Sequence, residues 1–420
     1  MLDFGAATPM GILASARGLA DIVFLCDRRL PYVRELVEEL REIATVCDIT
    51  DLAGAGLADL LERLDLDGIT TFSEMRLNVT AALAQRLGLP YQSPDAARAL
   101  TDKLTQRRIL AEAGVQATRC RAVRGVADLG GALAEVGLPA ILKPRSGVAS
   151  AYACRVDTAA EAAVRLGDFL AHRPGAAGDF VVEEMLVGDP SVAGAGWGDY
   201  VSVESVTSHG VVRHIEITGK FPLAEPLRET GYVVPSTLVE STRRQVLRLT
   251  EAAVLALGVR HGVTHVEVKL TPDGPRIIEV NGRLGGYVAD LVRRARGFDL
   301  VRAALAAALG VAAEPAPDGY RRHAFQYFIT PPMRATVLRR LDGVAELGGH
   351  RGIQLVETFK RVGERLDWRD GTLTYLGIVH GSAPDHDGVA RLVALAERTL
   401  RIDYDLILGN GPDEPGRRIL

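Results

Sequence analysis

Residues 264–283 read THVEVKLTPDGPRIIEVNGR, and this stretch decides the fold. Two short alternating runs flank the turn residues 272–274, and turn chemistry between apolar/polar alternations predicts a β-hairpin. Successive side chains of a strand point to opposite faces, so Glu279 and Asn281 share one face of the second run, and Glu267 lies on one face of the first. If the strands pair, these side chains converge as oxygen ligands of the kind that Mg²⁺ prefers. The stretch therefore predicts a place where a metal–nucleotide complex can be held.

The polar face of the second run continues to Arg283, while Ile278 and Val280 are expected on the opposite face. Arg283 would then be a fixed cation beside the predicted ligands. An alternating hairpin with outward charges is more often an ordinary half-exposed sheet, so the hairpin alone does not establish the metal–nucleotide interpretation. Further motifs along the same chain favour the metal–nucleotide interpretation.

Four motifs precede the hairpin, in the order 101–107 TDKLTQR, 140–144 AILKP, 145–150 RSGVAS and 180–188 FVVEEMLVG. The first is expected to open a helix, and the second is an apolar strand that carries a lysine. The third is a loop of small residues, which leave backbone N–H groups free to approach phosphate oxygens. Such a loop is more often a plain turn when it stands alone, so the common order of the motifs carries the inference.

Together these motifs span about residues 100–310 and resemble the ATP-grasp superfamily of carboxylate–amine ligases. The resemblance implies two lysines on the nucleotide phosphates, a strand at the adenine edge and metal ligands in the hairpin. The implied nucleotide-binding residues are Lys103, Lys143, Ser146, Gly147, Ser150, Glu183, Glu184, Leu186 and Asp189; the implied metal ligands are Glu267, Glu279 and Asn281. Many relatives hold the ribose with an acidic residue shortly after the hinge glycine. Asp189 is a substitute one position early, and ribose recognition stays open.

Residues 217–221 ITGKF and 229–236 ETGYVVPS resemble the L-amino-acid ligases of the bacilysin-synthetase type, as do 328–332 FITPP and 375–379 YLGIV. This resemblance implies an ATP-dependent ligase. A carboxylate, expected to belong to an amino acid, would attack the γ-phosphate of ATP to give an acyl phosphate and ADP. An amine would then displace phosphate and form a dipeptide or another amide. The implied cofactors are ATP and Mg²⁺, with two ions expected and Mn²⁺ as a substitute.

Arg283 is expected to face the acyl phosphate, because a planar guanidinium grips two oxygens in fixed geometry. Lys220 is the second candidate catalytic residue, and Glu229 and Tyr287 are candidate substrate contacts. A surface role for Lys220 and Glu229, and a helix-start role for Tyr287, are the alternatives.

Two other functions stay open, because a fold does not determine a function. One is another ATP-grasp carboxylate ligase, either carboxylase-like or from a nucleotide pathway. The other is a non-catalytic ATP-binding protein, against which the intact set of polar residues in the hairpin argues.

The expected fold class is α/β and α+β, an ATP-grasp fold in three parts. These are an N-terminal α/β (pre-ATP-grasp) domain at 1–96, an ATP-grasp nucleotide-binding domain at 97–313 with a mobile lid at about 118–187, and a C-terminal α+β cap domain at 314–420.

Within the first part, strands at 21–26 and 68–72 alternate with a helix at 31–43, which predicts a parallel sheet with covering helices. The Ala-rich residues 301–313 are expected to form a buried helix, and residues 411–418 are expected to be frayed.

Composition indicates a soluble cytoplasmic enzyme. The formal net charge of −4 argues against a nucleic-acid partner, which usually requires a basic excess. The four cysteines have no CxxC spacing and are expected to be reduced thiols. There is no basic leader and no apolar run of about 18 residues, so no membrane partner is expected. The expected partners are a small-molecule carboxylate and an amine, and a homodimer is left open.

Overall fold

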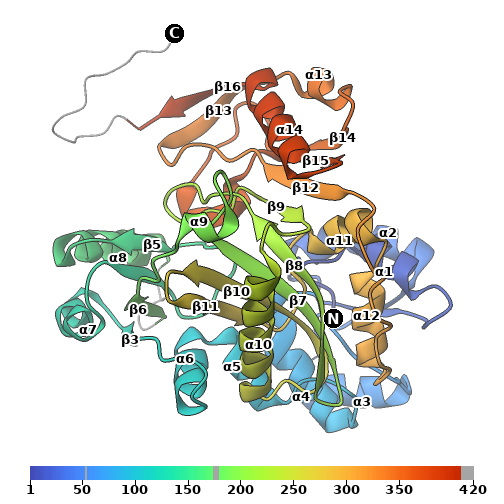
Figure 1. The fold of residues 1–420 in the computed structure, drawn as a ribbon. Coiled ribbons are helices and arrows are strands. Elements are labelled where there is room, and N and C mark those ends of the chain that lie inside the picture. Colours follow the sequence, from blue (N-terminus) through green and yellow to red (C-terminus); the bar gives the residue numbers. More distant parts are fainter. Residues whose placement is uncertain (53, 174–178, 408–420) are drawn as a thin grey trace, which may run out of the picture.

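The computed structural model describes residues 1–52, 54–173 and 179–407 (Figure 1). The predicted fraying at 411–418 lies outside these residues. The described residues contain two two-stranded sheets, one four-stranded sheet and one long sheet of eight strands. This arrangement of helices around mainly antiparallel sheets agrees with the expected α/β and α+β class.

In the N-terminal part, β1 (Val23–Cys26) and β2 (Thr45–Asp48) form a parallel pair connected by α2 (Pro31–Ile43). The helix agrees with its prediction residue for residue, since Pro31 starts it and an apolar stripe of Val33, Val37 and Leu40 is buried. The other helices of this part are α1 (Pro9–Ala16), α3 (Gly54–Arg63), η1 (Glu74–Arg76), α4 (Leu77–Leu87) and α5 (Pro94–Thr101).

The predicted strand at 68–72 was wrong. This segment has no strand geometry and instead accepts isolated hydrogen bonds from the start of the chain. The terminal amino group of Met1 donates to the Thr70 carbonyl at 2.7 Å, and the Ala6 N–H donates to the Phe72 carbonyl at 3.0 Å. These separate bonds do not form the ladder of a strand. The second strand is β2, whose short polar sequence carried no apolar signal.

A four-stranded antiparallel sheet lies within the residues of the predicted lid. Its order is β3–β6–β4–β5, built from β3 (Cys120–Val123), β4 (Ala140–Pro144), β5 (Cys154–Val156) and β6 (Phe180–Glu184). The 3₁₀ turn η2 (Val126–Asp128) and the helices α7 (Leu129–Val136) and α8 (Ala159–His172) accompany it, and the apolar faces of the two helices complete its core. α6 (Lys103–Glu112) leads into this sheet.

The eight-stranded sheet has the order β11–β10–β7–β8–β9–β12–β15–β14. Its strands are β7 (Tyr200–Ser208), β8 (Val211–Lys220), β9 (Gly231–Val234), β10 (Gly262–Thr271), β11 (Gly274–Asn281), β12 (His323–Phe328), β14 (Ile353–Thr358) and β15 (Gly377–Ala383). The sheet continues from β9 to β12 across residue 313, so backbone hydrogen bonds join the two parts of the chain there. The domain limits at 96 and 313 stay predictions.

Helices cover both faces of the long sheet (Figure 1). α10 (Glu240–Ala256) packs on one face through Val246, Ala253 and Val254. α11 (Val288–Arg296) and α12 (Leu300–Ala308) cover the other, and α12 is the buried helix predicted in the Ala-rich segment, although it ends at Ala308. The short α9 (Pro190–Ala193) follows β6.

The C-terminal part adds β13 (Ala335–Asp342) paired with β16 (Arg401–Leu406), together with α13 (Val344–Gly348), η3 (Trp368–Thr374) and α14 (His386–Thr399). α14 packs its buried residues Val389, Val393 and Ala396 into a core shared with β12 and β15.

The hairpin that opened the sequence analysis is β10–β11, with a two-residue connection at 272–273. One detail differs from the prediction. A β-bulge shifts the register after Glu267, so that Val268 pairs with Ile277 and leaves Ile278 as the extra residue. Ile277, rather than Ile278, is therefore buried together with Val280, and Ile278 is only partly buried.

Candidate active site

The two hairpin glutamates lie directly opposite each other on adjacent strands. Glu267 on β10 is the direct partner of Glu279 on β11, and His265 is the partner of Asn281 two residues along. The side chains of Glu267 and Glu279 are 25% and 17% exposed, so they are sheltered but reachable. Val266 and Val280 point to the opposite face, into the core under α10. The predicted pairing of strands is confirmed, and it places two carboxylates and a carboxamide on one face.

The start of α6 reaches this face. Asp102 caps the helix by accepting hydrogen bonds from the N–H groups of Leu104 and Thr105, which orients Lys103 in the first turn. The Nζ atom of Lys103 lies 2.8 Å from Oε1 of Glu279. The same Nζ lies 3.4 Å from the carbonyl oxygen of Gly147 in the small-residue loop. Lys103 therefore connects the hairpin to that loop.

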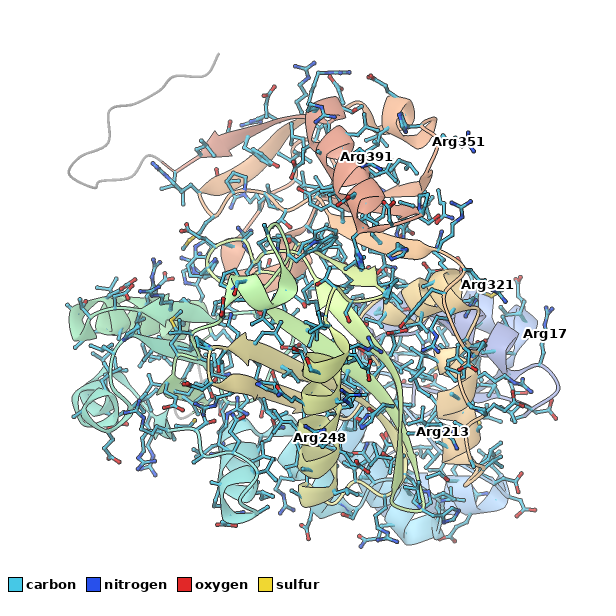
Figure 2. All side chains as sticks on the ribbon, in the orientation of Figure 1. Arg17, Arg213, Arg248, Arg321, Arg351 and Arg391 are labelled. Carbon is cyan, nitrogen blue, oxygen red and sulfur yellow. The ribbon has the colours of Figure 1, made fainter. Side chains whose placement is uncertain are left out.

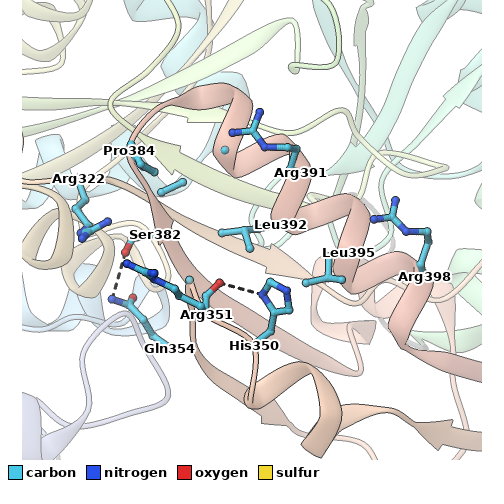
Figure 3. Close-up of a pocket in the computed structure, with 13 residues that line it drawn as sticks. Arg322, His350, Arg351, Gln354, Ser382, Pro384, Arg391, Leu392, Leu395 and Arg398 are labelled. Atoms are coloured by element: carbon cyan, nitrogen blue, oxygen red, sulfur yellow. Dashed lines mark hydrogen bonds between the residues drawn. The ribbon is translucent and has the colours of Figure 1, made fainter.

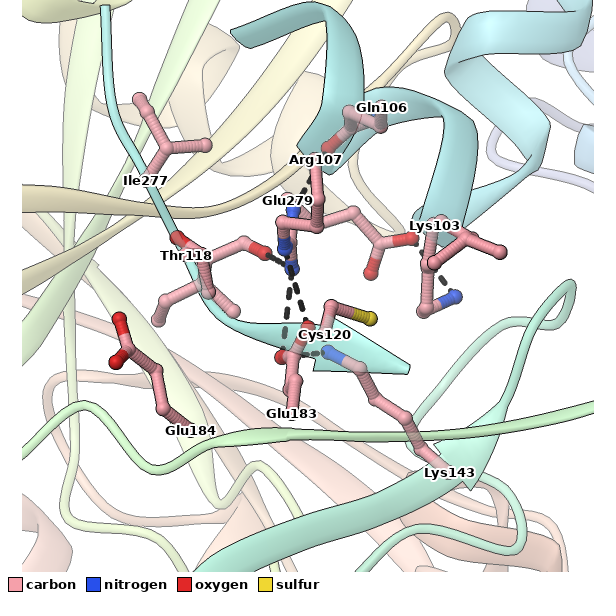
Figure 4. Close-up of polar contacts among 12 residues, drawn as sticks. Lys103, Gln106, Arg107, Thr118, Cys120, Lys143, Glu183, Glu184, Ile277 and Glu279 are labelled. Atoms are coloured by element: carbon pink, nitrogen blue, oxygen red, sulfur yellow. Dashed lines mark hydrogen bonds and ion pairs between the residues drawn. The ribbon is translucent and has the colours of Figure 1, made fainter. Parts of the chain in front are cut away.

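A buried charge network lies between α6 and the four-stranded sheet (Figure 4). Glu183 on β6 pairs with Lys143 on β4 and with Arg107 on α6, whose Nε lies 3.1 Å from Oε2 of Glu183. Burial by itself would raise the pKa of Glu183, but the two cations outweigh it and lower this pKa to about 2. Arg107 also donates to the carbonyl oxygen of Ile278, the bulged residue. The network thus joins the lid strands to the hairpin. Arg107 was not singled out from the sequence, although it stood inside the motif 101–107.

His265 organises the other side of the carboxylate pair. Its Nδ1 lies 2.7 Å from Oε1 of the fully buried Glu204 on β7, and its Nε2 lies 3.6 Å from Oε1 of Glu267. Burial alone would lower the pKa of His265, but the charge and hydrogen bond of Glu204 raise it to about 9. Burial alone would raise the pKa of Glu267, but the hydrogen bond and charge of the neighbouring His265 outweigh it and lower this pKa. The imidazolium and the Glu267 carboxylate are therefore both charged at neutral pH.

Arg283 lies just beyond β11, and its nearest partner comes from the N-terminal part of the chain. Its Nε atom lies 3.2 Å from Oε2 of Glu74, in η1. Its Nη2 lies 3.5 Å from Oδ1 of Asn281, and its Nη1 donates to the Leu284 carbonyl at 2.9 Å. Burial raises the pKa of Glu74 to about 7 against the opposing effect of Arg283. The sequence carried no signal for Glu74, since it lies outside every motif and pairs across more than 200 residues.

Lys220 is at the end of β8 with a fully buried side chain, so the surface alternative for this residue is wrong. Its Nζ lies 2.9 Å from Oε1 of Glu229 and 3.8 Å from the ring centroid of Tyr232. The hydroxyl of Tyr232 donates to Oε2 of Glu229 at 2.6 Å. Lys220 and Glu229 therefore form one buried unit in which an aromatic face and a carboxylate hold the cation.

Tyr287 lies shortly after Arg283 in the chain and has a left-handed φ of 61° immediately before α11. Its hydroxyl lies 2.8 Å from the hydroxyl of Tyr375, and its ring packs edge-on against Phe328. The residue directly precedes α11, as the helix-start alternative expected, and its contact with a substrate stays a prediction.

The remaining predicted residues lie along the lid. Ser146 is exposed, Gly147 and Ser150 are partly buried, and Ser150 has a left-handed φ of 54°. Glu184 is held by two arginines, with Arg119 Nε at 2.8 Å and Arg276 Nη2 at 3.0 Å.

Leu186 follows the end of β6 and is partly buried. Asp189 caps α9 by accepting from the N–H of Ser191 at 2.9 Å and from its hydroxyl. The carboxylate that was a candidate for the ribose is thus engaged as a helix cap, and the ribose contact stays open.

The donors present suit Mg²⁺ in combination with phosphate. Within the described ranges, no group of three or more His, Cys, Asp or Glu side chains is arranged to hold a metal ion. Glu267, Glu279 and Asn281 offer two carboxylates and a carboxamide, and Mg²⁺ usually binds through one or two carboxylates plus substrate phosphates. The residues therefore fit an ion that arrives with a nucleotide.

Two family models match the chain, the ATP-grasp N-terminal domain at residues 13–91 and the ATP-grasp domain at residues 136–290. Over 258 residues the chain is 29% identical to alanine–anticapsin ligase of Bacillus subtilis (strain 168), covering 59% of this chain and 54% of that protein. Over 278 residues it is 30% identical to human (Homo sapiens) carnosine synthase 1, covering 61% of this chain and 32% of that protein. The chain thus spans about half the length of alanine–anticapsin ligase, and less of carnosine synthase.

Solved structures share the fold. An L-amino acid ligase from Bacillus licheniformis superposes with a TM-score of 0.73 at 23% identity, covering 92% of this chain and 98% of that one. A phosphoribosylglycinamide synthetase from Anaerococcus prevotii gives a TM-score of 0.64 at 15% identity, covering 96% and 98%. Among the helices of the described residues, none is long and apolar enough to cross a membrane. The motifs, the fold and the family models agree, and the chain belongs to the ATP-grasp superfamily.

Proposed function

We propose that this protein is an ATP-dependent carboxylate–amine ligase that activates an amino acid as an acyl phosphate and joins it to an amine. The observation that carries the proposal is the facing pair Glu267 and Glu279 with three cations around it. Lys103 lies at 2.8 Å from Glu279, Arg283 follows the end of β11, and Lys220 ends β8, which β7 separates from β10. Two facing carboxylates suit a metal-bound polyphosphate, and the cations suit its negative oxygens.

The nucleotide side of the site uses Lys103, Lys143 and the loop at 145–150. Phosphoryl transfer needs little covalent help from a protein, so positioning and charge neutralisation are the main tasks. Lys103 pairs with Glu279 and Lys143 pairs with Glu183, and these ion pairs hold both ammonium groups where phosphates would bind. When bound, Mg²⁺ would neutralise phosphate charge beside Glu267, Glu279 and Asn281. We infer two ions, with Mn²⁺ as a substitute.

The reacting carboxylate and the amine would meet beside Arg283. Its guanidinium, held by Glu74, can grip two oxygens of the acyl phosphate and of the tetrahedral intermediate. The amine nitrogen would add to the acyl carbon to give the tetrahedral intermediate, which then breaks its bond to the phosphate oxygen and releases phosphate and a proton to leave the amide. The buried pair of Lys220 and Glu229, and Tyr287, would contact the substrates. Asp189 stays the candidate for the ribose hydroxyls, with Glu183, Glu184 and Leu186 at the adenine.

An amino acid as substrate is supported by the names of the relatives, since alanine–anticapsin ligase names an amino acid that it joins. Of the two solved structures described above, the one with the higher TM-score is itself an L-amino acid ligase. A cytoplasmic location is supported by four free cysteines and by the need for ATP. A homodimer rests on the family resemblance.

The experiment is phosphate release from ATP and Mg²⁺ over a matrix of L-amino-acid pairs, with mass spectrometry of the positive wells. The expected result is ADP and phosphate together with a new amide mass, which identifies both substrates. The double variant Glu267→Gln/Glu279→Gln, which lacks both proposed carboxylate ligands, serves as the matched control for contaminating ATPase. If ATP binds but no acid and amine pair raises ADP formation above this control, the ligase proposal is overturned in favour of a non-catalytic ATP-binding protein.

A further inference from the structure

One segment of the C-terminal part touches both the lid and the substrate side of the site. We call residues 367–375 the bridging segment; it contains η3. Trp368 is 9% exposed and is buried within the core of the four-stranded sheet rather than in its own part of the chain. Its ring lies 5.9 Å from that of Phe169 on α8, and the Arg165 guanidinium lies 5.3 Å from its centroid. The lid core is thus completed by a residue almost 200 positions downstream.

Arg369 adds a two-point ion pair to the lid. Its Nε and Nη2 lie 2.7 Å and 2.8 Å from the two carboxylate oxygens of Asp168 on α8, a fork geometry that is among the stronger ion-pair arrangements. Asp367 holds the same guanidinium through Nη1 at 2.9 Å. The Arg369 carbonyl accepts a hydrogen bond from the Tyr152 N–H at 2.8 Å, just beyond the small-residue loop.

The bridging segment also touches the small-residue loop. The Thr372 N–H donates to the Ala149 carbonyl at 2.8 Å. Gly371 has a φ of 64°, and a Cβ atom there would lie 2.1 Å from the same carbonyl oxygen. A side chain at Gly371 is therefore excluded both by backbone conformation and by the close approach of the loop.

The opposite side of the segment holds the substrate residues. The Thr372 hydroxyl accepts from the Glu229 N–H at 3.1 Å, and the Thr374 hydroxyl accepts from Arg228 Nη1 at 3.2 Å. Tyr375 completes the contact through its 2.8 Å hydroxyl pair with Tyr287. Thr372 therefore joins the backbone of the predicted phosphate loop to the backbone of Glu229.

We propose that Arg369 and Thr372 are positioning residues that couple lid closure to substrate alignment. Arg369 holds the lid closed through Asp168, so that nucleotide phosphates are shielded from water. Thr372 sets the distance between the phosphate loop and the Lys220–Glu229 pair, and so makes substrate alignment depend on a closed lid. The catalytic part of this inference rests on the proposed function, whereas the lid contact can be measured without turnover.

The lid contact is tested by hydrogen exchange at Tyr152, whose N–H is bonded to Arg369, in full-length protein with saturating ADP and Mg²⁺. Arg369→Ala and Asp168→Asn are expected to speed exchange in this peptide by about tenfold or more, because local opening governs the rate. Arg369→Lys should recover part of the protection. The control is Glu135→Gln, which removes an exposed ion pair with Arg121 inside the lid. Equal exchange in wild type, Arg369→Ala and the control would overturn the proposal that Arg369 holds the lid closed. This outcome does not depend on which reaction the protein catalyses.

The coupling is tested by steady-state kinetics with the substrates found in the amino-acid matrix. Thr372→Val keeps the shape and the backbone bond to Ala149 but removes the acceptor for Glu229, whereas Thr372→Ser keeps both. Thr372→Val is expected to raise KM for the amino acid and lower kcat, with KM for ATP unchanged and Thr372→Ser near wild type. Arg369→Ala is expected to raise ATP hydrolysis per amide formed. A uniform fall in kcat for Thr372→Val and Thr372→Ser alike would overturn the positioning role.

A second inference rests on a separate hollow in the C-terminal part, away from the hairpin (Figure 3). Its volume is about 720 Å³, within the range of small-molecule pockets. Leu392 and Leu395 of α14 form an apolar floor, and four arginines surround them: Arg322, Arg351, Arg391 and Arg398. No acidic residue is among the described side chains that line it.

The four guanidinium groups are little neutralised. Within residues 1–52, 54–173 and 179–407, Arg391 has one ion pair, to Asp385 at 3.9 Å with both side chains exposed, and the other three have none. Such a concentration of positive charge stands on a chain whose formal net charge is −4. Guanidinium groups recognise phosphate and carboxylate oxygens, and the apolar floor suits a hydrophobic body. We propose that this hollow binds a small molecule with an apolar body and two or more negative charges.

The probe is 1-naphthyl phosphate, titrated by calorimetry into protein whose nucleotide site is saturated with ADP and Mg²⁺. Saturable binding is expected, and the double variant Arg351→Gln/Arg398→Gln should weaken it by about tenfold or more, the loss expected for charge-assisted hydrogen bonds. The control Arg213→Gln/Arg248→Gln removes two exposed arginines from other elements and should leave binding unchanged (Figure 2). Uncharged 1-naphthol should bind much more weakly. Absence of binding to wild type, or equal binding to both double variants, would overturn the proposal.

Discussion

The Nε atom of Arg283 lies 3.2 Å from Oε2 of Glu74, so the cation beside the hairpin carboxylates is held by the N-terminal part of the chain. The two side chains are 15% and 7% exposed, and Arg283 lowers the pKa of Glu74 more than Lys103 does. The N-terminal part therefore contributes directly to the candidate active site, and the orientation of Arg283 depends on how that part packs against the long sheet.

Replacement of Arg283 by alanine should lower kcat without a matching loss of ADP affinity. The arginine is placed to act on the acyl phosphate, and loss of one such donor typically costs about 3 kcal/mol of transition-state stabilisation. Steady-state ligase kinetics and ADP calorimetry on the same preparations measure both quantities. Wild-type turnover in Arg283→Ala would remove this residue from the mechanism.

Glu74→Gln should change how stability depends on pH. The pKa of Glu74 is raised to about 7 by burial, so the folded protein prefers the protonated acid and its contribution to stability is lost as pH rises from the unfolded value towards 7. Between pH 5 and pH 8 the glutamine variant should gain stability relative to wild type, by roughly 2–3 kcal/mol on the scale of 1.36 kcal/mol per pKa unit. Denaturant titrations at both pH values provide the comparison. A pH-independent difference would contradict the raised pKa.

Glu267→Gln and Glu279→Gln should each increase the Mg²⁺ concentration that gives half-maximal ADP formation. Loss of a residue that only hydrogen-bonds to a metal ligand commonly weakens metal binding by about tenfold. Loss of a direct ligand, the role proposed for these glutamates, should weaken it at least as much. The control is Glu240→Gln on α10, where the side chain is 67% exposed. An unchanged Mg²⁺ dependence in both hairpin variants would refute the metal role.

Glu183→Gln should destabilise the lid strongly, because it leaves Arg107 and Lys143 buried without their carboxylate. Breaking a buried charge pair on one side typically costs about 3–5 kcal/mol. Urea unfolding can be followed by the fluorescence of Trp368 in the lid core, in a background with Trp197→Phe. Glu135→Gln, at an exposed lid pair, should shift the transition by far less. Equal transitions in the two variants would show that the network adds little to lid stability.

Local patterns in the sequence predicted much of the architecture. The β10–β11 hairpin, β4 and the helix Pro31–Ile43 follow from alternation, turn residues and a helix-starting proline. The failures were also local. The apolar run at 68–72 looked like a strand, but its hydrogen bonds go singly to the chain start. The bulge at Ile278 shifted the buried position to Ile277, since alternation cannot show where a ladder accepts an extra residue.

Alternation and turn residues predicted the hairpin and the convergence of its glutamates, because these patterns depend only on neighbours in the chain. The overall fold and the candidate lysines followed from the resemblance of the motifs to the ATP-grasp superfamily. Tertiary structure alone decided what surrounds them. Glu74 reaches Arg283, Arg107 reaches Glu183, and Trp368 completes the lid core, each across a long stretch of chain. Such contacts carry no local pattern, since burial and charge pairing between distant segments are set only when the parts of the chain pack together.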